Sequence, residues 1–84
     1  MYYLYILKSK YDQAGYIGST TDLRRRLLEH QRGLVQSTKN RRPLDLVYYE
    51  AYKSLADARR REQMLKLKSR AYAQLRQRIR DSIS

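Results

Sequence analysis

The stretch that most constrains the fold runs from Tyr16 to His30. It opens with Tyr-Ile-Gly, a short aromatic and apolar segment typical of a β-strand. Hydroxyl residues follow, and then Asp22, a residue type that caps helix N-termini. Three consecutive arginines and an apolar stripe indicate a helix over Leu23–Arg32, which Gly33 ends. A strand, a glycine and a capped basic helix in this order are suited to holding a phosphate.

The length and composition indicate one small domain, residues 1–84. The chain has no cysteine, so no disulfide and no thiolate metal site is expected, and no disulfide-linked partner. No apolar run is long enough to span a bilayer, and the N-terminal apolar segment is too short for a signal peptide. We therefore expect a cytoplasmic protein without a membrane partner.

The charge balance is strongly basic, with 19 Lys and Arg against 8 Asp and Glu and a formal net charge of +11. Such an excess favours a polyanionic partner, because lysines and arginines that neutralise phosphates release condensed counterions. An anionic membrane surface is disfavoured, since the chain has no Trp or Phe to serve as a bulky anchor. Nucleic acid is the leading candidate, and nine tyrosines could stack on bases.

Periodicity and turn residues predict an α+β fold, a three-stranded antiparallel sheet flanked by about three helices. The predicted strands are Tyr2–Lys8, expected at the centre, Tyr16–Ser19 and Leu44–Tyr52. The predicted helices are Leu23–Arg32, Leu55–Lys68 and Arg70–Arg80, with Ser54 and Ser69 as caps of the last two. The final Asp-Ser-Ile-Ser is predicted to fray.

Alternation along the strands predicts which side chains share a face. If the first two strands pair, Tyr5 and Tyr16 can lie on the same face. In the third strand, one alternating set of side chains is expected on one face of the sheet and a second set on the other face. The first set is Leu44, Leu46, Tyr48 and Tyr52, and the second is Val47, Tyr49 and Ala51.

The first helix is predicted to bury Leu23 and Leu27, with Leu28 beside them. Arg26 and His30 are four residues apart and so share a flank next to this stripe. Arg24 and Arg25 project elsewhere, either into solvent or towards a phosphate backbone. A polar and basic segment, Leu34–Pro43, is predicted to be a loop, equally consistent with a backbone clamp and with a solvated connection.

The second long helix contains an anomaly, because Glu62 falls inside the apolar stripe formed by Leu55, Ala58 and Leu65. A carboxylate on a core-facing stripe is costly unless it is paired or bound to a metal. One interpretation is a salt bridge at the rim of the core, with Arg59, Arg61 or Lys66 as the partner. The other is a metal site, and in a chain without His or Cys clusters this suits a largely hydrated Mg²⁺.

The order of these elements and residues resembles the GIY-YIG endonuclease superfamily. More narrowly, it is similar to the small stand-alone branch that resembles the N-terminal domain of an excinuclease subunit. The resemblance covers Tyr2 to about Arg70. Its motifs are Tyr3-Leu4-Tyr5 in place of Gly-Ile-Tyr, Tyr16-Ile17-Gly18, the helix Asp22–His30, Arg41-Arg42-Pro43-Leu44 and Ala58-Arg59-Arg60-Arg61-Glu62.

The resemblance implies a site for phosphodiester hydrolysis built from five residues. Tyr5 is the candidate general base or base-orienting group, and it needs neighbouring cations to depress its pKa from about 10. Tyr16 would hydrogen-bond the water or the phosphate, and Arg26 would clamp the phosphate. Glu62 would hold Mg²⁺ or Mn²⁺ on the leaving-group side. His30 would shuttle a proton or contact the nucleic-acid backbone.

Two features depart from the family pattern. Tyr3 replaces the glycine of the first motif, and no Asn follows Glu62, where many members place one near the phosphate. Phosphate positioning then falls to Asn40 or to basic residues. The predicted backbone contacts are Arg24, Arg25, Lys39, Asn40, Arg41 and Arg42.

The leading hypothesis is a metal-dependent endonuclease that hydrolyses DNA and recognises structure rather than sequence, in repair or recombination. Branched, nicked or single-stranded DNA is the expected partner, because so small a domain has little surface for reading bases. A non-catalytic module that keeps the fold and the charge is the alternative. A basic partner of ribosomal RNA or of an acidic protein is a weaker third.

Overall fold

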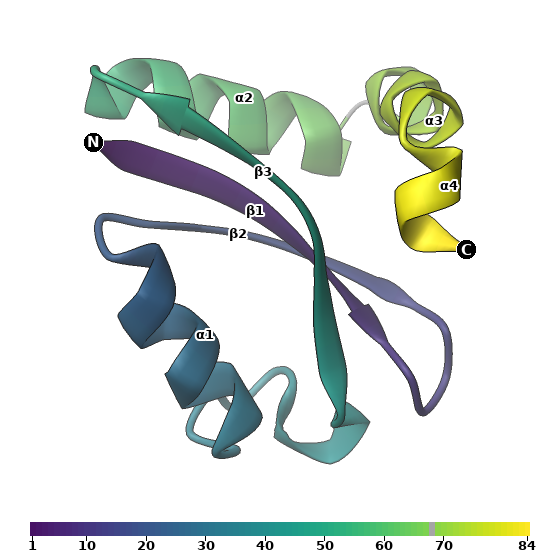
Figure 1. The fold of residues 1–84 in the computed structure, drawn as a ribbon. Coiled ribbons are helices and arrows are strands. Elements are labelled where there is room, and N and C mark those ends of the chain that lie inside the picture. The colour runs from purple at the N-terminus through teal and green to yellow at the C-terminus, as the bar shows by residue number, and fades with distance from the viewer. Residues whose placement is uncertain (68) are drawn as a thin grey trace.

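A three-stranded antiparallel sheet runs through the middle of the structure, with helices on both of its faces (Figure 1). The computed structural model describes residues 1–67 and 69–84, and the side chains of all of these except residue 69. Their elements in chain order are β1 (Tyr2–Ser9), β2 (Gly15–Thr20), α1 (Leu23–Gln31), the 3-10 helix η1 (Lys39–Arg41), β3 (Leu44–Tyr52), α2 (Leu55–Leu67), α3 (Ser69–Arg78) and α4 (Arg80–Ile83). The α+β prediction is confirmed, and β1 is the central strand of the order β2-β1-β3.

The two faces of β1 build two separate cores, because successive side chains of a strand point to opposite sides. Leu4 and Ile6 lie on the face covered by α2 and α3, where they pack with Leu65 and Leu75. The opposite face carries a cluster of buried hydrophobic residues, Tyr5, Leu7 and Leu44, under Leu23 and Leu27 of α1. Figure 1 shows α1 and α2 on opposite sides of the sheet. This division determines which residues can meet at a site.

A bulge in β3 changes the predicted alternation of that strand. Tyr48 pairs with Ile6 and Leu46 pairs with Leu7, so Val47 has no partner on β1. An extra residue reverses the side to which the following side chains point. Leu44 therefore packs in the core under α1, and Tyr48 packs in the core under α2. The prediction that both share one face is wrong for this reason.

The face of β3 under α2 carries a half-buried carboxylate. Glu50 accepts hydrogen bonds from the hydroxyls of Tyr48, at 2.6 Å, and Tyr52, and from Arg61 Nε at 3.1 Å. Burial alone would raise the pKa of Glu50, but Arg61 and the two hydroxyls outweigh it and lower the pKa. Arg61 is thus paired with Glu50 and is not the salt-bridge partner of Glu62 that the sequence suggested.

Helix α1 begins as predicted, since Asp22 accepts a hydrogen bond from the Arg25 backbone N–H at 3.0 Å. It ends one residue earlier than predicted, followed by Gly33 with φ of 77°. Leu28 was expected beside the buried stripe but is 49% exposed. It lies one position beyond Leu27 and so turns about 100° away from the core.

The C-terminal end differs most from the prediction. The predicted helix over Arg70–Arg80 is interrupted after Arg78, and the residues predicted to fray continue as α4. Ile83 packs against the core, and Lys8 Nζ donates a hydrogen bond to its carbonyl oxygen at 2.7 Å. The predicted end of α2 at Lys68 and the predicted cap by Ser69 lie outside the described part.

The N-terminal end of α2 differs from the prediction in one respect. Leu55, expected in the buried stripe, is 39% exposed, whereas Ala58 and Leu65 are buried as predicted. Among the described helices, none has both the length and the hydropathy to cross a bilayer.

Candidate active site

Three aromatic rings meet where α1 covers β1 and β2. Tyr5 and Tyr16 lie on the same face of the sheet, with ring centroids 6.3 Å apart, as the strand pattern predicted. The imidazole of His30 packs edge-on against both, at 5.6 Å from Tyr5 and 5.2 Å from Tyr16. Tyr5 and His30 are fully buried, whereas Tyr16 is partly exposed. Tyr16 is therefore the ring of this cluster that a bound substrate can reach.

His30 links the cluster to the loop after α1. Its Nε2 lies 2.8 Å from the hydroxyl of Tyr5, and its Nδ1 lies 2.8 Å from Oγ1 of Thr38, itself fully buried. Burial lowers the pKa of His30, and the nearby Arg26 guanidinium lowers it further. The imidazole is thus neutral at pH 7, and one of its nitrogens donates while the other accepts. Burial also excludes the contact with a nucleic-acid backbone predicted for His30.

Gly18 allows Tyr5 to approach β2 closely. It lies opposite Tyr5 in the strand pairing, and a Cβ at this position would stand 2.5 Å from the Tyr5 hydroxyl oxygen and 2.6 Å from Cζ. Only a residue without a side chain leaves this space free. The glycine of the Tyr-Ile-Gly motif therefore has a packing role in the site.

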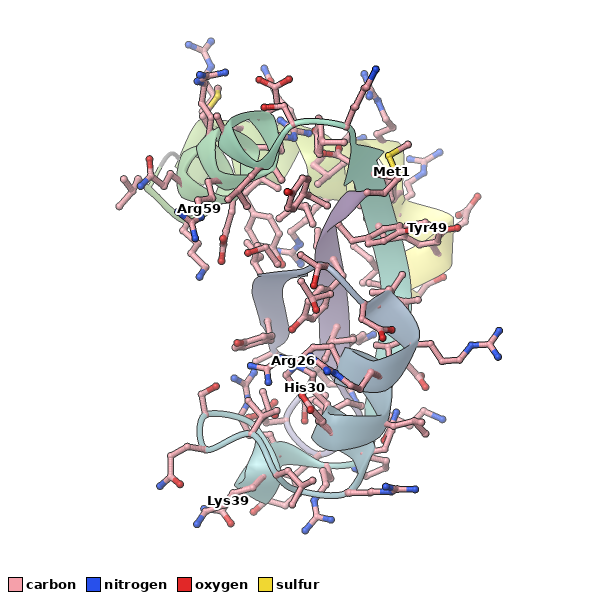
Figure 2. The ribbon with its side chains drawn as sticks, turned by 90° about the vertical axis from the view of Figure 1, so that its left-hand side faces the viewer. Met1, Arg26, His30, Lys39, Tyr49 and Arg59 are labelled. Atoms are coloured by element: carbon pink, nitrogen blue, oxygen red, sulfur yellow. The ribbon has the colours of Figure 1, made fainter. Side chains whose placement is uncertain are left out.

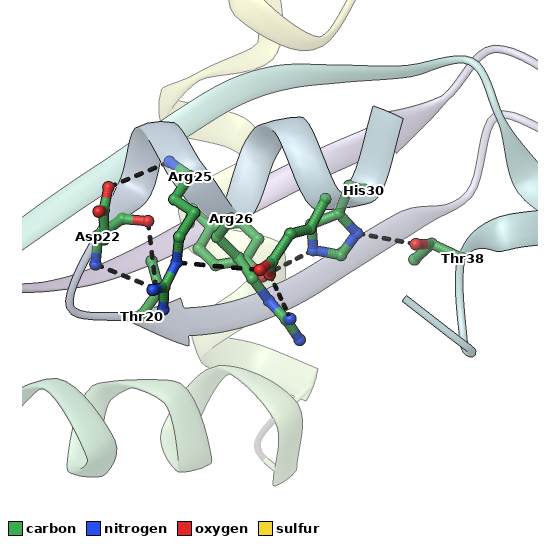
Figure 3. A network of polar contacts seen from close by, with 8 residues as sticks. Thr20, Asp22, Arg25, Arg26, His30 and Thr38 are labelled. Carbon is green, nitrogen blue, oxygen red and sulfur yellow. Dashed lines mark hydrogen bonds and ion pairs between the residues drawn. The ribbon is translucent and has the colours of Figure 1, made fainter. Parts of the chain in front are cut away.

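Arg26 extends from α1 next to His30, as Figures 2 and 3 show. Its Nη1 donates a hydrogen bond to Oε1 of Glu29 at 2.9 Å, and its side chain is 36% exposed. The guanidinium is also near enough to Tyr5 to act on the pKa of that phenol. Arg26 thus stands between the buried rings and solvent, where a phosphate could approach it.

Glu62 reaches the site from α2, around the β2 edge of the sheet. Its Oε1 accepts a hydrogen bond from Ser19 Oγ at 2.8 Å, and its Oε2 is paired with Lys66 Nζ at 2.7 Å. Its side chain is 18% exposed. Of the predicted salt-bridge partners, Lys66 is the one observed. The carboxylate remains close enough to Tyr5 to raise the pKa of its phenol.

The general-base role predicted for Tyr5 is not supported. Burial raises the pKa of Tyr5 to about 12, although the Arg26 guanidinium acts in the opposite direction. A phenol with this pKa stays protonated at neutral pH, and its full burial keeps water away from it. In this structure, Tyr5 instead holds the imidazole of His30 in place.

A divalent metal would rest on very few protein ligands here. Among residues 1–67 and 69–84, no three His, Cys, Asp or Glu side chains gather as a metal site. Mg²⁺ commonly keeps several waters and takes one or two carboxylates, so Glu62 fits such an ion as a single ligand. Lys66 would have to release Oε2, which its 48% exposed side chain can do by turning into solvent.

The predicted backbone contacts are dispersed around α1 and the following loop. Arg25 is exposed and lies 3.9 Å from Glu29, and Arg24 lines a groove on the flank of α1 away from the rings. Lys39, Asn40 and Arg42 are exposed in and beside η1. Arg41 is instead half-buried and paired with Asp12, with Nε 3.3 Å from Oδ2.

Several residues of the site were not predicted. Glu29 could have been found, because it stands three residues from Arg26 on the same helix. Thr38 and Ser19 gave no such signal. They meet His30 and Glu62 through the fold alone, from a loop and from a neighbouring strand.

The burial of His30 predicts acid sensitivity. The folded state has a His30 pKa below the usual value of about 6.5, so the unfolded chain binds more protons as the pH falls. We expect the free energy of unfolding to decrease as the pH is lowered below about 6.5, by about 1.4 kcal/mol for each unit of pKa difference. Urea unfolding curves between about pH 7.5 and pH 5 measure this.

His30 is the chain's single histidine, which makes the control simple. The variant His30→Gln keeps polar atoms near Tyr5 and Thr38 but does not titrate in this range. We expect it to be less stable at pH 7 and to lose the pH dependence below about 6.5. An unchanged slope in the variant would contradict the assignment.

The chain is of a known class of catalytic domain, because the family model described as the GIY-YIG catalytic domain matches residues 1–79. The chain belongs to the GIY-YIG family. It is 43% identical to a UPF0213 protein of Staphylococcus haemolyticus over 70 residues, 82% of this chain and 84% of the relative. A UPF0213 protein of Streptococcus pneumoniae is 41% identical, over 81% of this chain and 69% of the relative.

A solved structure agrees with this assignment. The solution NMR structure of a UPF0213 protein from Bacillus halodurans is similar with a TM-score of 0.57 and 38% identity, over 89% of this chain and 82% of that one. The GIY-YIG domain implies nuclease activity and a nucleic-acid substrate. Nucleases of this family typically use divalent metals.

Proposed function

We propose that this chain is a metal-dependent endonuclease that hydrolyses DNA phosphodiester bonds at branched, nicked or unpaired sites. One observation carries the proposal: Tyr16 and Arg26 border a buried Tyr5–His30 pair on one side of the β2 edge, and Glu62 borders the same edge from the other side. The 84 residues act as a single GIY-YIG-like domain, in the cytoplasm, in repair or recombination.

The chemistry follows from which side chains are accessible. Tyr16 hydrogen-bonds the attacking water or the scissile phosphate, since its ring is partly exposed beside the buried Tyr5. Arg26 turns from Glu29 to the phosphate and stabilises the negative charge that grows on the phosphate oxygens. Tyr5 and His30 are hydrogen-bonded to each other, and both rings pack against Tyr16. The pair therefore holds the Tyr16 ring in place, next to Arg26.

Glu62 is the residue that would hold Mg²⁺ or Mn²⁺. A divalent ion held by Glu62 would neutralise charge on the leaving-group side of a phosphodiester. Ser19 supports the carboxylate through Oε1. Lys66 donates a hydrogen bond to the other oxygen, Oε2, so a metal would have to compete with the lysine for it.

Cleavage assays test the proposal directly. The purified protein is incubated with branched, nicked, single-stranded and duplex DNA in Mg²⁺, in Mn²⁺ and in EDTA. We expect cleavage with either metal, fastest on branched or unpaired DNA, and none in EDTA. Cleavage in EDTA would refute the metal dependence, and absence of cleavage on every substrate would refute the nuclease.

A non-catalytic DNA-binding module is the second candidate, and one observation favours it. Arg26 and Glu62 are both engaged within the protein, with Glu29 and with Lys66. This candidate predicts binding that weakens steeply with salt, that EDTA does not change, and that is never followed by a cut. The same assays therefore decide between the two.

A further inference from the structure

A groove lies beside α1 that the proposed active site does not use. It has a volume of about 660 Å³ and is bounded by α1, β1 and β3. Its lining residues are mainly apolar or aromatic, notably Tyr3, Leu23, Leu27, Leu28 and Tyr49. Figure 2 shows Tyr49 well separated from Arg26 and His30. The groove and the active site thus lie on different flanks of the same helix.

Two tyrosine rings meet in this groove. The rings of Tyr3 and Tyr49 contact each other edge to face, with centroids 6.2 Å apart and planes at 60°. Tyr49 is 52% exposed, and it stands directly opposite the buried Tyr5 in the pairing of β1 with β3. Its backbone is therefore held firmly while its ring is open to a ligand. Exposed aromatic rings on a sheet are the usual stacking surface for unpaired bases.

The net charge of the chain favours an anionic ligand for the groove. The groove itself is lined by one charge of each sign, the exposed Arg24 and the Asp22 carboxylate that caps α1. The chain has a net charge of +11, which disfavours a second copy as the occupant because the copies repel each other. A nucleotide combines the two properties required, a flat base for the tyrosines and a phosphate for Arg24.

A short segment at the end of β2 connects the groove with the surroundings of Glu62. Ser19, which hydrogen-bonds Glu62, and Thr21, which lines the groove, are separated by one residue. A DNA strand bound at Glu62 can thus continue over this short segment into the groove. Bases within a duplex are stacked and paired, so only an unpaired nucleotide could place its base there.

We propose that this groove binds an unpaired nucleotide of the DNA substrate next to the cleavage site, with its base on Tyr49 and Tyr3 and its phosphate on Arg24. This inference rests on the proposed function and deepens it. It assigns the preference for branched or unpaired DNA to a particular surface. It also gives a reason for the exposure of Tyr49 and Leu28 in a groove that Arg24 lines as well.

Binding measurements in EDTA test the groove without cleavage. Fluorescence anisotropy gives the dissociation constant for a labelled oligothymidine of about 12 nucleotides, within the usual range of such sites, and for a duplex of the same length. We expect Tyr49→Ala to weaken single-strand binding about tenfold and duplex binding less than about twofold. Tyr49→Phe keeps the stacking surface and should stay within about twofold of the wild type for both.

Tyr11 provides a matched control, because it is 75% exposed in the turn between β1 and β2 and lies outside the groove. Tyr11→Ala should bind both DNAs as the wild type does. Equal losses for Tyr11→Ala and Tyr49→Ala, or an equal loss on duplex, would overturn the proposal. So would a wild-type dimer in sedimentation that Tyr49→Ala dissociates, since the occupant would then be a second copy.

The two proposals fail in different ways. If the wild type cuts DNA with Mg²⁺ and Tyr49→Ala binds single strands normally, the groove proposal is refuted and the nuclease stands. If the wild type binds no DNA at all, both are refuted.

Discussion

Replacing Glu62 with Gln or Arg26 with Ala is expected to lower the rate of DNA cleavage by about 100-fold or more. Glu62→Gln keeps an oxygen for Ser19 but removes the charge that would hold a divalent ion. Arg26→Ala removes the cation that stabilises the phosphate. Single-turnover cleavage of a branched DNA in Mg²⁺ measures both effects.

Arg60→Ala is the matched control for Arg26→Ala. Arg60 is also a helix arginine in an i,i+3 ion pair, with Nη1 3.1 Å from Oδ1 of Asp57, and its side chain is 68% exposed. It should cut at nearly the wild-type rate. Both variants should unfold at nearly the wild-type urea concentration, because exposed ion pairs contribute only about 0–1 kcal/mol. Undiminished cleavage by Glu62→Gln and Arg26→Ala would refute the proposed site.

Gly18→Ala is expected to impair both the stability and the site. The new Cβ would stand 2.5 Å from the Tyr5 hydroxyl oxygen, and Tyr5 is fully buried, so its ring cannot move freely. Overpacking of this kind costs about 1–3 kcal/mol. A displaced Tyr5 would also pull His30 from its position, because the two share a hydrogen bond. We expect a lower urea midpoint and a cleavage rate at least about tenfold lower.

Gly15→Ala is the same substitution at the first residue of β2. Its Cβ would contact the Tyr72 hydroxyl, in the core under α2 and α3 and away from the rings of the site. We expect it to destabilise the protein while the folded molecules cut at nearly the wild-type rate. If Gly18→Ala and Gly15→Ala lower cleavage equally, the close approach of Tyr5 to Gly18 has no special role in catalysis.

The strands and helices could be predicted from the sequence because the signals for them are local. Asp22 and Gly33 bound α1 through interactions with residues a few positions away, and the predicted range of β3 matches the observed one. The bulge at Val47 could not be predicted, since it depends on pairing with β1. Helix α4 was not predicted for a similar reason, because Ile83 packs against a core assembled from distant segments.

The sequence predicted the proximity of several candidate side chains, but not their environment. Tyr5, Tyr16, Arg26 and His30 come together as predicted, and Glu62 borders the same edge from α2. The protonation behaviour of Tyr5 and His30 follows from burial, which is a property of the packed molecule. A strand pattern shows which face a tyrosine occupies, but not whether water reaches it.

The sequence by itself determined the order of elements, the basic charge and the residue types gathered in Tyr16–His30, because spacing and caps act over a few residues. The tertiary structure decided that Tyr5 is a buried partner of His30 and that Tyr16 is the more accessible tyrosine of the pair. It also decided that Glu62 meets Ser19 and that Tyr49 borders an open groove. These depend on contacts between strands and helices far apart in the chain, which no local pattern encodes.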